Sequence, residues 1–226
     1  MNKTFKLKSL LLSMVVAGAA TASIAPTVAQ AGVSANIGAV TNYVFRGVEQ
    51  TETASASAGL DYEDESGIYV GTWVADVERG IEYDLYAGWG GEFEGVAVGI
   101  GGTYYGYTHE GFDTSYTELN LSVGYGMFSA GYDMGSWEDG ATAGGDADYN
   151  HIYVGAEMGD FSATLGQTDY KDEVDGALTY IDVSYSTELS AGLDGTVTYT
   201  YASPEDSTAP NETYLVLGVS KSFDIM

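Results

Sequence analysis

Residues 212–223 read Glu-Thr-Tyr-Leu-Val-Leu-Gly-Val-Ser-Lys-Ser-Phe, and their side chains alternate between two kinds. The odd-numbered positions are mostly large and apolar and include Leu215, Leu217, Val219 and Phe223. The even-numbered positions are mostly small or polar and include Val216, Gly218, Ser220 and Ser222. A β-strand points successive side chains to opposite faces, so this stretch has one apolar and one small or polar face. In a soluble sandwich the apolar face would pack into a core, whereas in a transmembrane barrel it would face lipid.

The same pattern recurs along the chain, and helical periodicity is absent after residue 31. It predicts twelve strands, at 33–46, 52–62, 67–77, 81–90, 95–107, 115–125, 127–134, 148–157, 160–168, 177–186, 195–202 and 212–223. Many of these strands contain glycine, which weakens an ordinary sheet but suits strands that bend around a closed barrel. In the third strand, Ile68, Val70 and Val74 compete with Tyr69 and Trp73 as the apolar face.

The connections between the predicted strands are sorted by length. Brief joins follow the second, fourth, sixth and eighth strands, at 63–66, 91–94, 125–126 and 158–159. Longer acidic stretches lie between them, at 108–114, 135–147, 169–176 and 203–211. An even number of strands with short turns at one rim and longer loops at the other is typical of bacterial transmembrane barrels. The join after the tenth strand, 187–194, is longer than this rule expects.

Tyrosines gather towards the ends of the predicted strands, where the interface between lipid and water would lie. They include Tyr43, Tyr62, Tyr83, Tyr104, Tyr107, Tyr125, Tyr132, Tyr185, Tyr201 and Tyr214. The alternative is a soluble periplasmic β-sandwich or jelly roll, in which tyrosines are ordinary strand residues. Loop lengths and tyrosine positions together favour an all-β fold, a transmembrane antiparallel up-and-down β-barrel of about twelve strands with both termini periplasmic.

The N-terminal residues have the features of a secretory signal. Lys3, Lys6 and Lys8 precede the apolar run 10–20, and Ala29-Gln30-Ala31 matches a cleavage site. The alternative, a membrane-anchoring helix, would need a longer apolar run. We therefore expect residues 1–31 to be a cleaved signal peptide and residues 32–226 to form a barrel in the outer membrane of the cell.

The chain is strongly acidic. It has 33 Asp and Glu against 7 Lys and Arg, a formal net charge of −26, and no cysteine. Three of the seven bases lie in the leader, which leaves Arg46, Arg79, Lys171 and Lys221. A chain with so few bases cannot neutralise phosphates, which excludes nucleic acid as a partner. It has no cysteine chemistry and no cysteine-based zinc site.

Four segments resemble the TorF-type porins, a proteobacterial outer-membrane family long described as of unknown function. They are Asn42-Tyr43-Val44-Phe45-Arg46-Gly47, Gly67-Ile68-Tyr69-Val70-Gly71-Thr72-Trp73, Tyr83-Asp84-Leu85-Tyr86-Ala87-Gly88-Trp89 and Ser220-Lys221-Ser222-Phe223. The resemblance covers essentially the whole mature chain, and the first segment is its most specific element. It implies an outer-membrane barrel with a pore function and no established substrate. Phe223 is then the C-terminal aromatic residue expected to meet the barrel-assembly machinery.

If the apolar parity faces lipid, the other parity lines the interior and is acidic. The candidate residues of an ion path are Arg46, Asp61, Glu82, Asp84, Glu118 and Asp182. As the single inward base, Arg46 is expected to pair with Glu82, Asp84 or Asp61, either as a structural salt bridge or as a group that selects solutes. The excess carboxylates either favour cations, as acidic rings do in channels, or are simply solvated.

Cofactor and enzyme motifs are missing from the sequence. No hydrolase elbow, zinc-protease motif or phosphate loop is present, and His109 and His151 have no obvious serine beside them. Residues 172–176, Asp-Glu-Val-Asp-Gly, lack the spacing of an EF-hand, although acidic loops could hold Ca²⁺ or Mg²⁺ loosely. We therefore expect a protein that is not an enzyme and has no cofactor.

The sequence leaves two functions open. The first is a porin-like channel for passive diffusion of small solutes, with a preference for cations. The second is a structural or adhesive barrel with a plugged lumen, filled by Tyr86, Tyr105, Tyr116 and Tyr153 together with Arg46, and with acidic surface loops. The expected partners are outer-membrane lipid and lipopolysaccharide, the barrel-assembly machinery, and small solutes or cations. The sequence does not determine the oligomeric state.

Overall fold

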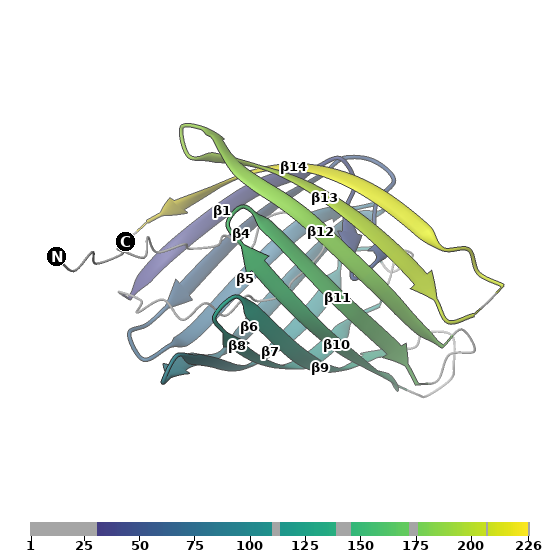
Figure 1. The fold of residues 1–226 in the computed structure, drawn as a ribbon, viewed down its shortest axis with the longest axis horizontal. Helices are drawn as coiled ribbons and strands as arrows, with labels where there is room; N and C mark the ends of the chain where they lie inside the picture. Colours follow the sequence, from purple (N-terminus) through teal and green to yellow (C-terminus); the bar gives the residue numbers. More distant parts are fainter. Residues whose placement is uncertain (1–30, 110–113, 139–145, 172–175, 207, 226) are drawn as a thin grey trace.

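The computed structural model describes residues 31–109, 114–138, 146–171, 176–206 and 208–225. Twelve antiparallel strands close into one barrel in the order β1-β14-β13-β12-β11-β10-β9-β8-β7-β6-β5-β4, and β2 and β3 form a separate two-stranded hairpin (Figure 1). The strands are β1 Gly32–Val40, β2 Val44–Phe45, β3 Val48–Glu49, β4 Ser55–Glu63, β5 Ile68–Val77, β6 Gly80–Phe93, β7 Val96–Tyr107, β8 Tyr116–Tyr125, β9 Phe128–Glu138, β10 Asp146–Met158, β11 Phe161–Tyr170, β12 Ala177–Ser190, β13 Leu193–Pro204 and β14 Glu212–Asp224.

The barrel closes between its first and last strands. Ser34 lies opposite Asp224 in the β1–β14 pair, and Gly32 lies opposite Glu63 in the β1–β4 pair. The start of β1 and the end of β14 therefore lie at the same rim. Within the described ranges, no helix is long and apolar enough to cross a membrane. The predicted leader is outside the described residues except for Ala31, and so is the 172–175 part of the acidic stretch.

The twelve predicted barrel strands are confirmed, with two corrections. The first wall strand ends at Val40 rather than at residue 46, and the chain then turns into the barrel. The join predicted at 187–194 shrinks to two residues, because β12 runs to Ser190 and β13 begins at Leu193. Ala191 and Gly192 both have positive φ, as a two-residue hairpin turn of type I′ requires.

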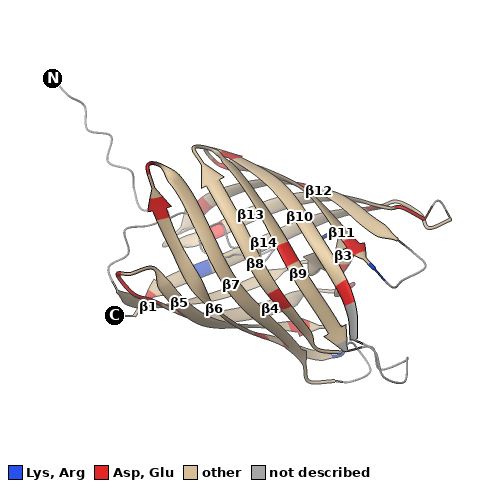
Figure 2. Ribbon diagram, turned by 90° about the horizontal axis from the view of Figure 1, so that it is seen from below, with Lys and Arg blue, Asp and Glu red and all other residues tan. Residues whose placement is uncertain are grey.

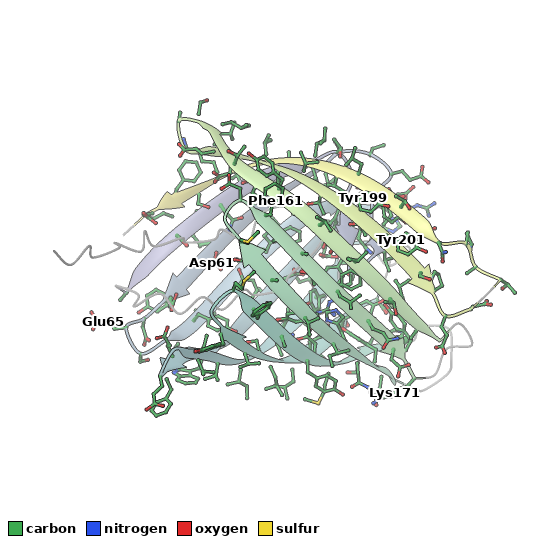
Figure 3. All side chains as sticks on the ribbon, viewed as in Figure 1. Asp61, Glu65, Phe161, Lys171, Tyr199 and Tyr201 are labelled. Carbon is green, nitrogen blue, oxygen red and sulfur yellow. The ribbon has the colours of Figure 1, made fainter. Side chains whose placement is uncertain are left out.

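With that correction, every connection at one rim of the barrel is a short turn. Tight turns at 64–67, 94–95, 126–127, 159–160 and 191–192 share one rim with the start of β1 and the end of β14, and we call it the short-turn rim. The remaining connections join strands at the opposite end, which we call the long-loop rim. Figure 3 shows Glu65, which lies in the first tight turn, and Lys171, which follows β11, at opposite ends of the barrel.

The outer surface of the barrel is apolar. Side chains such as Leu85, Ile100 and Val154 are about half exposed, although they lie in the middle of strands. Buried side chains include Glu82, Asp133 and His151 from the opposite parity. In the third wall strand, Ile68 and Val70 are exposed, whereas Tyr69 and Trp73 are half-buried on the inner face. This reversal of the soluble pattern is that of a barrel surrounded by lipid.

A charge on the outer face should therefore cost more than the same charge on the inner face. Leu165 lies near the middle of β11, is 51% exposed and pairs with Val154 and Ile181 on the lipid side. We expect Leu165→Arg to lower the free energy of unfolding in bilayers by about 2–4 kcal/mol. Its neighbour Thr164 faces inward and pairs with Asp182, so Thr164→Arg should be much better tolerated. Urea titration of both variants in liposomes checks this; equal losses would contradict the lipid-facing assignment.

Several strand glycines pair with a tyrosine on the neighbouring strand. Gly131 pairs with Tyr153, Gly135 with Tyr149 and Gly166 with Tyr180. A Cβ atom at any of the three glycines would clash with the ring of its partner. The tyrosine rings thus lie flat against the bare backbone, an arrangement that compensates for the missing side chain. Glycine here allows close approach of an inner ring to the wall.

Candidate functional site

The chain between β1 and β4 folds into the barrel. Residues 41–54, which we call the lumen hairpin, contain β2 and β3, with Val44 opposite Glu49 and Phe45 opposite Val48. Arg46 and Gly47 form the tip, with φ of 50° and 82°. Positive φ at both central residues is the requirement of a type I′ turn, whose twist matches that of two antiparallel strands.

Gly47 is needed at this tip for a second reason. A Cβ atom at residue 47 would lie 2.8 Å from the Cβ of Tyr180 on β12 and 3.1 Å from the Cβ of Ala202 on β13. The tip therefore touches the barrel wall, and only a residue without a side chain fits there. The Arg46 side chain contacts β8 and β9 instead, so the hairpin meets the wall on separate groups of strands.

The base of the lumen hairpin is fixed near its own strands. The Thr41 backbone N–H donates to the carbonyl of Leu217 on β14 at 2.9 Å. Tyr43 donates its hydroxyl hydrogen to Glu82 on β6 at 2.8 Å and packs with Ala75 and Val77 of β5 in a small buried apolar cluster. Direct contacts to β5, β6 and β14 hold the hairpin inside the bore rather than over the rim.

Arg46 is the centre of a buried charge network. Its Nη1 atom lies 2.5 Å from Oε1 of Glu118 on β8, and its Nη2 atom lies 2.9 Å from Oδ2 of Asp133 on β9. The side chain of Glu118 is fully buried, and that of Arg46 is 6% exposed. Asn120 donates from Nδ2 to both Glu118 and Asp133, at 2.9 and 3.0 Å. A guanidinium suits this place because its fork of donors can reach two carboxylates at once.

Tyrosines complete the coordination of Glu118. Tyr105 on β7 donates to Oε2 at 2.9 Å, and Tyr149 on β10 donates to Oε1 at 2.7 Å. Both carboxylate oxygens of Glu118 thus accept hydrogen bonds from a tyrosine and from Arg46. A buried carboxylate is tolerated only when it is paired and hydrogen-bonded in this way.

His151 extends the network along the wall. Its Nδ1 atom lies 2.9 Å from Oδ2 of Asp133, and its Nε2 atom lies 3.0 Å from the hydroxyl of Tyr180. The imidazole is fully buried and stacks between the rings of Tyr153 and Tyr180. His109, by contrast, is exposed after the end of β7.

The structure places all six predicted ion-path residues inside the barrel. Arg46, Glu82, Asp84 and Glu118 are buried around the lumen hairpin. Asp61 on β4 and Asp182 on β12 are only half-buried and accept hydrogen bonds from Tyr86 and Thr200. The two groups therefore differ in their exposure to the bore. The four residues around the lumen hairpin are enclosed, whereas Asp61 and Asp182 remain partly exposed to the bore.

The predicted partners of Arg46 are wrong. The expectation of Glu82, Asp84 or Asp61 assumed that Arg46 lies on the first wall strand, next to β4 and its neighbours. Because the chain leaves the wall after Val40, the hairpin carries Arg46 across the bore to Glu118 and Asp133. Nothing local in the sequence pairs Tyr149 with Glu118 or Tyr180 with His151, although Tyr149 shares the inward parity of His151. The dipeptides Val44-Phe45 and Val48-Glu49 flank Arg46-Gly47, and this pattern was a local signal for a short hairpin.

Chemically, this arrangement is an internal strut across the bore. Charges buried in one network hold the tip of the lumen hairpin against two strands, and the hairpin reduces the free cross-section of the barrel at that level. Towards the short-turn rim, the inner face includes small residues such as Ser122, Gly155 and Thr164. Figure 2 shows acidic residues along the strands and at both rims, with few basic residues among them.

Comparison with solved structures identifies similar barrels. The KdgM porin superposes with a TM-score of 0.57 at 10% identity, covering 84% of this chain and 99% of that one. KdgM in complex with disordered oligogalacturonate gives a TM-score of 0.54 at 9% identity, with 85% and 99% covered. A barrel from a study of the in-meso crystallisation of membrane proteins gives 0.58 at 11% identity, with 87% and 84% covered. The shared feature is the fold of outer-membrane porins.

No curated protein matches the sequence. A family model does, over residues 25–223, which is nearly the whole chain. Its description is a bacterial protein of unknown function, Gcw_chp. The acidic twelve-stranded barrel with its lumen hairpin belongs to the Gcw_chp family of bacterial proteins of unknown function.

Proposed function

We propose that the protein is an outer-membrane channel for passive diffusion of small solutes, constricted by the lumen hairpin. The observation that carries this proposal is the reversed face pattern, in which apolar side chains cover the outside and polar or small side chains line the inside. A barrel of twelve strands lies between the filled eight-stranded barrels and the open sixteen-stranded porins. A barrel of this intermediate size is expected to hold a narrow path, and the lumen hairpin narrows that path further.

The channel is proposed to prefer cations. Arg46 is a buried base inside the barrel, and Glu118 and Asp133 bind its charge. Asp61 and Asp182 contact the neutral hydroxyls of Tyr86 and Thr200, so their charge is not offset by these partners. Carboxylates that face the path and lack a basic partner lower the free energy of cations there and raise that of anions.

The setting of the channel is part of the same proposal. Its apolar surface contacts outer-membrane lipid and lipopolysaccharide, its short-turn rim and both termini face the periplasm, and the barrel-assembly machinery inserts it. The protein acts as a TorF-type porin, without catalysis and without a cofactor.

Measurements in planar bilayers test the channel and its selectivity. We expect stepwise conductance with a reversal potential in a salt gradient that indicates cation preference. The double variant Asp61→Asn/Asp182→Asn should shift the reversal potential towards zero. The matched control is Asp76→Asn/Asp169→Asn, which removes two acids from the outer face and should leave the potential nearly unchanged. Absence of conductance contradicts the channel, and anion preference in the wild type contradicts the selectivity.

The second candidate is a plugged structural or adhesive barrel, and one observation favours it. Tyr105 and Tyr153 are buried inside the barrel together with Arg46, as a filled bore requires. Tyr86 and Tyr116 are only half-buried, so they fill the bore less completely. A barrel that never conducts, even at high voltage, supports this alternative.

A further inference from the structure

Five aromatic side chains form a continuous band on the inner wall near the long-loop rim. They lie on five consecutive strands, β7 to β11, and we call them the aromatic ladder: Tyr107, Tyr116, Trp137, Tyr149 and Tyr170. Tyr116 is directly opposite Trp137, and Tyr149 is directly opposite Tyr170. Ring centroids are 5.9–6.3 Å apart from one member to the next, and Tyr116 and Trp137 are stacked at 27°.

The ladder is not an interfacial belt that anchors the barrel in lipid. Its members share the inward parity with Glu118, Asp133 and His151, and they are buried or half-buried. Tyr201 on β13, in contrast, lies on the outer face near the same rim and is exposed. The ladder also lies directly above the charge network, because the hydroxyl of Tyr149 donates to Glu118. Tyr107 also packs against the buried apolar cluster of Tyr43, Ala75 and Val77, so the ladder lies beside the base of the lumen hairpin.

We propose that the aromatic ladder binds neutral oligosaccharides at the mouth of the barrel. Flat aromatic faces match the C–H-rich faces of sugar rings, and burying an aromatic side chain against a ligand supplies a large apolar contact. Neighbouring strands are about 4.8 Å apart, so five strands extend the ladder over roughly 19 Å. A band of this length suits a chain of several sugar rings better than a single small cation.

The charge around the ladder selects against acidic sugars. Arg46, below the ladder, is held by two carboxylates. Lys171 follows Tyr170 directly, but it has the opposite parity and is exposed, so it belongs to the outer face. An anionic sugar on the ladder would approach Glu118 and Asp133 without a free inward base among the described residues. The ligand is therefore an uncharged sugar chain.

The proposed sugar is the substrate class of the channel proposed above, so the role of the aromatic ladder in transport rests on that proposed function. The binding of sugar to the ladder does not depend on it. Binding is measured by isothermal titration calorimetry on the refolded full barrel in detergent. The ligands are maltohexaose, cellohexaose and isomaltohexaose, which are neutral and differ in linkage. Hexagalacturonate and choline serve as the acidic and the cationic competitor classes. We expect at least one neutral sugar to bind more tightly than both.

Variants separate stacking from a general effect on folding. Trp137→Ala and Tyr116→Ala should each weaken sugar binding about five- to tenfold, the loss of one aromatic contact. Trp137→Phe, which keeps a ring, should stay close to the wild type. Tyr201→Ala, a tyrosine at the same rim on the outer face, should bind sugar as the wild type does. Circular dichroism and heat-modified gel mobility confirm that each variant is folded.

The outcomes are distinct. If no neutral sugar binds, if choline or hexagalacturonate binds more tightly, or if Tyr201→Ala weakens binding as much as Trp137→Ala, the ladder proposal is overturned. Sugar binding to a barrel that does not conduct supports the ladder and refutes the channel. Conductance without sugar binding refutes the ladder and leaves the channel in place.

Discussion

Replacing Arg46 with methionine is expected to lower the free energy of unfolding by about 3–5 kcal/mol, because it leaves buried carboxylates without their counter-charge. Glu118 is fully buried and Asp133 nearly so, and both contact the guanidinium. The loss of the cation leaves two negative charges that are almost completely shielded from solvent. Urea titration of the refolded barrel in bilayers measures the effect.

Three further variants show whether the network is the cause. Arg46→Lys keeps the charge but loses the two-carboxylate fork, so it should be intermediate. Arg46→Met combined with Glu118→Gln and Asp133→Asn removes the unpaired charges and should recover much of the stability. Arg79→Met, a change at an exposed arginine in the turn before β6, should have almost no effect. A similar loss in Arg79→Met and Arg46→Met would be inconsistent with a buried strut.

Removal of the lumen hairpin is expected to raise single-channel conductance several-fold. Val40 of β1 and Ser55 of β4 are directly paired, so residues 41–54 can be replaced by a two-residue Asn-Gly turn without a change of register. The shortened barrel lacks the segment that contacts β5 to β9 and β12 to β14 across the bore. Its free cross-section at that level should therefore increase.

The deletion needs compensation, because it also removes Arg46. The variant should carry Glu118→Gln and Asp133→Asn, and a full-length barrel with the same two substitutions is its matched control. Planar-bilayer recordings then compare two barrels whose walls carry the same charge, one without the lumen hairpin and one with it. If their conductances agree, the hairpin does not limit the path. If neither conducts, the barrel is closed elsewhere and the plugged alternative is favoured.

Most of the wall was predictable from the sequence, because the alternation of side chains is a local property of each strand. Of the two corrections, the one that changes the interior is the end of the first strand. Tyr43 and Phe45 continue the two-residue period of the wall strand, so residues 33–46 look like one element. The short β2–β3 hairpin has the same two-residue period as a wall strand. Only the pairing of these residues in the folded barrel shows that they form a hairpin rather than a continuation of β1.

The candidate site was predictable in kind but not in its pairing. Parity alone placed Asp61, Glu82, Asp84, Glu118 and Asp182 on the inner face, and the structure places them there. The aromatic ladder was missed because its five rings come from strands spread over more than sixty residues of sequence. Rings on neighbouring strands meet only when the register of each pair is fixed.

The sequence by itself determined the number of wall strands, the lipid-facing side of every strand except the third, and the acidic character of the interior. These follow from side-chain alternation and composition, which need no long-range information. Only the tertiary structure decided that residues 41–54 enter the bore and that Arg46 pairs with Glu118 and Asp133. The reason is that partners 72 and 87 residues away come within reach only after the sheet closes on itself.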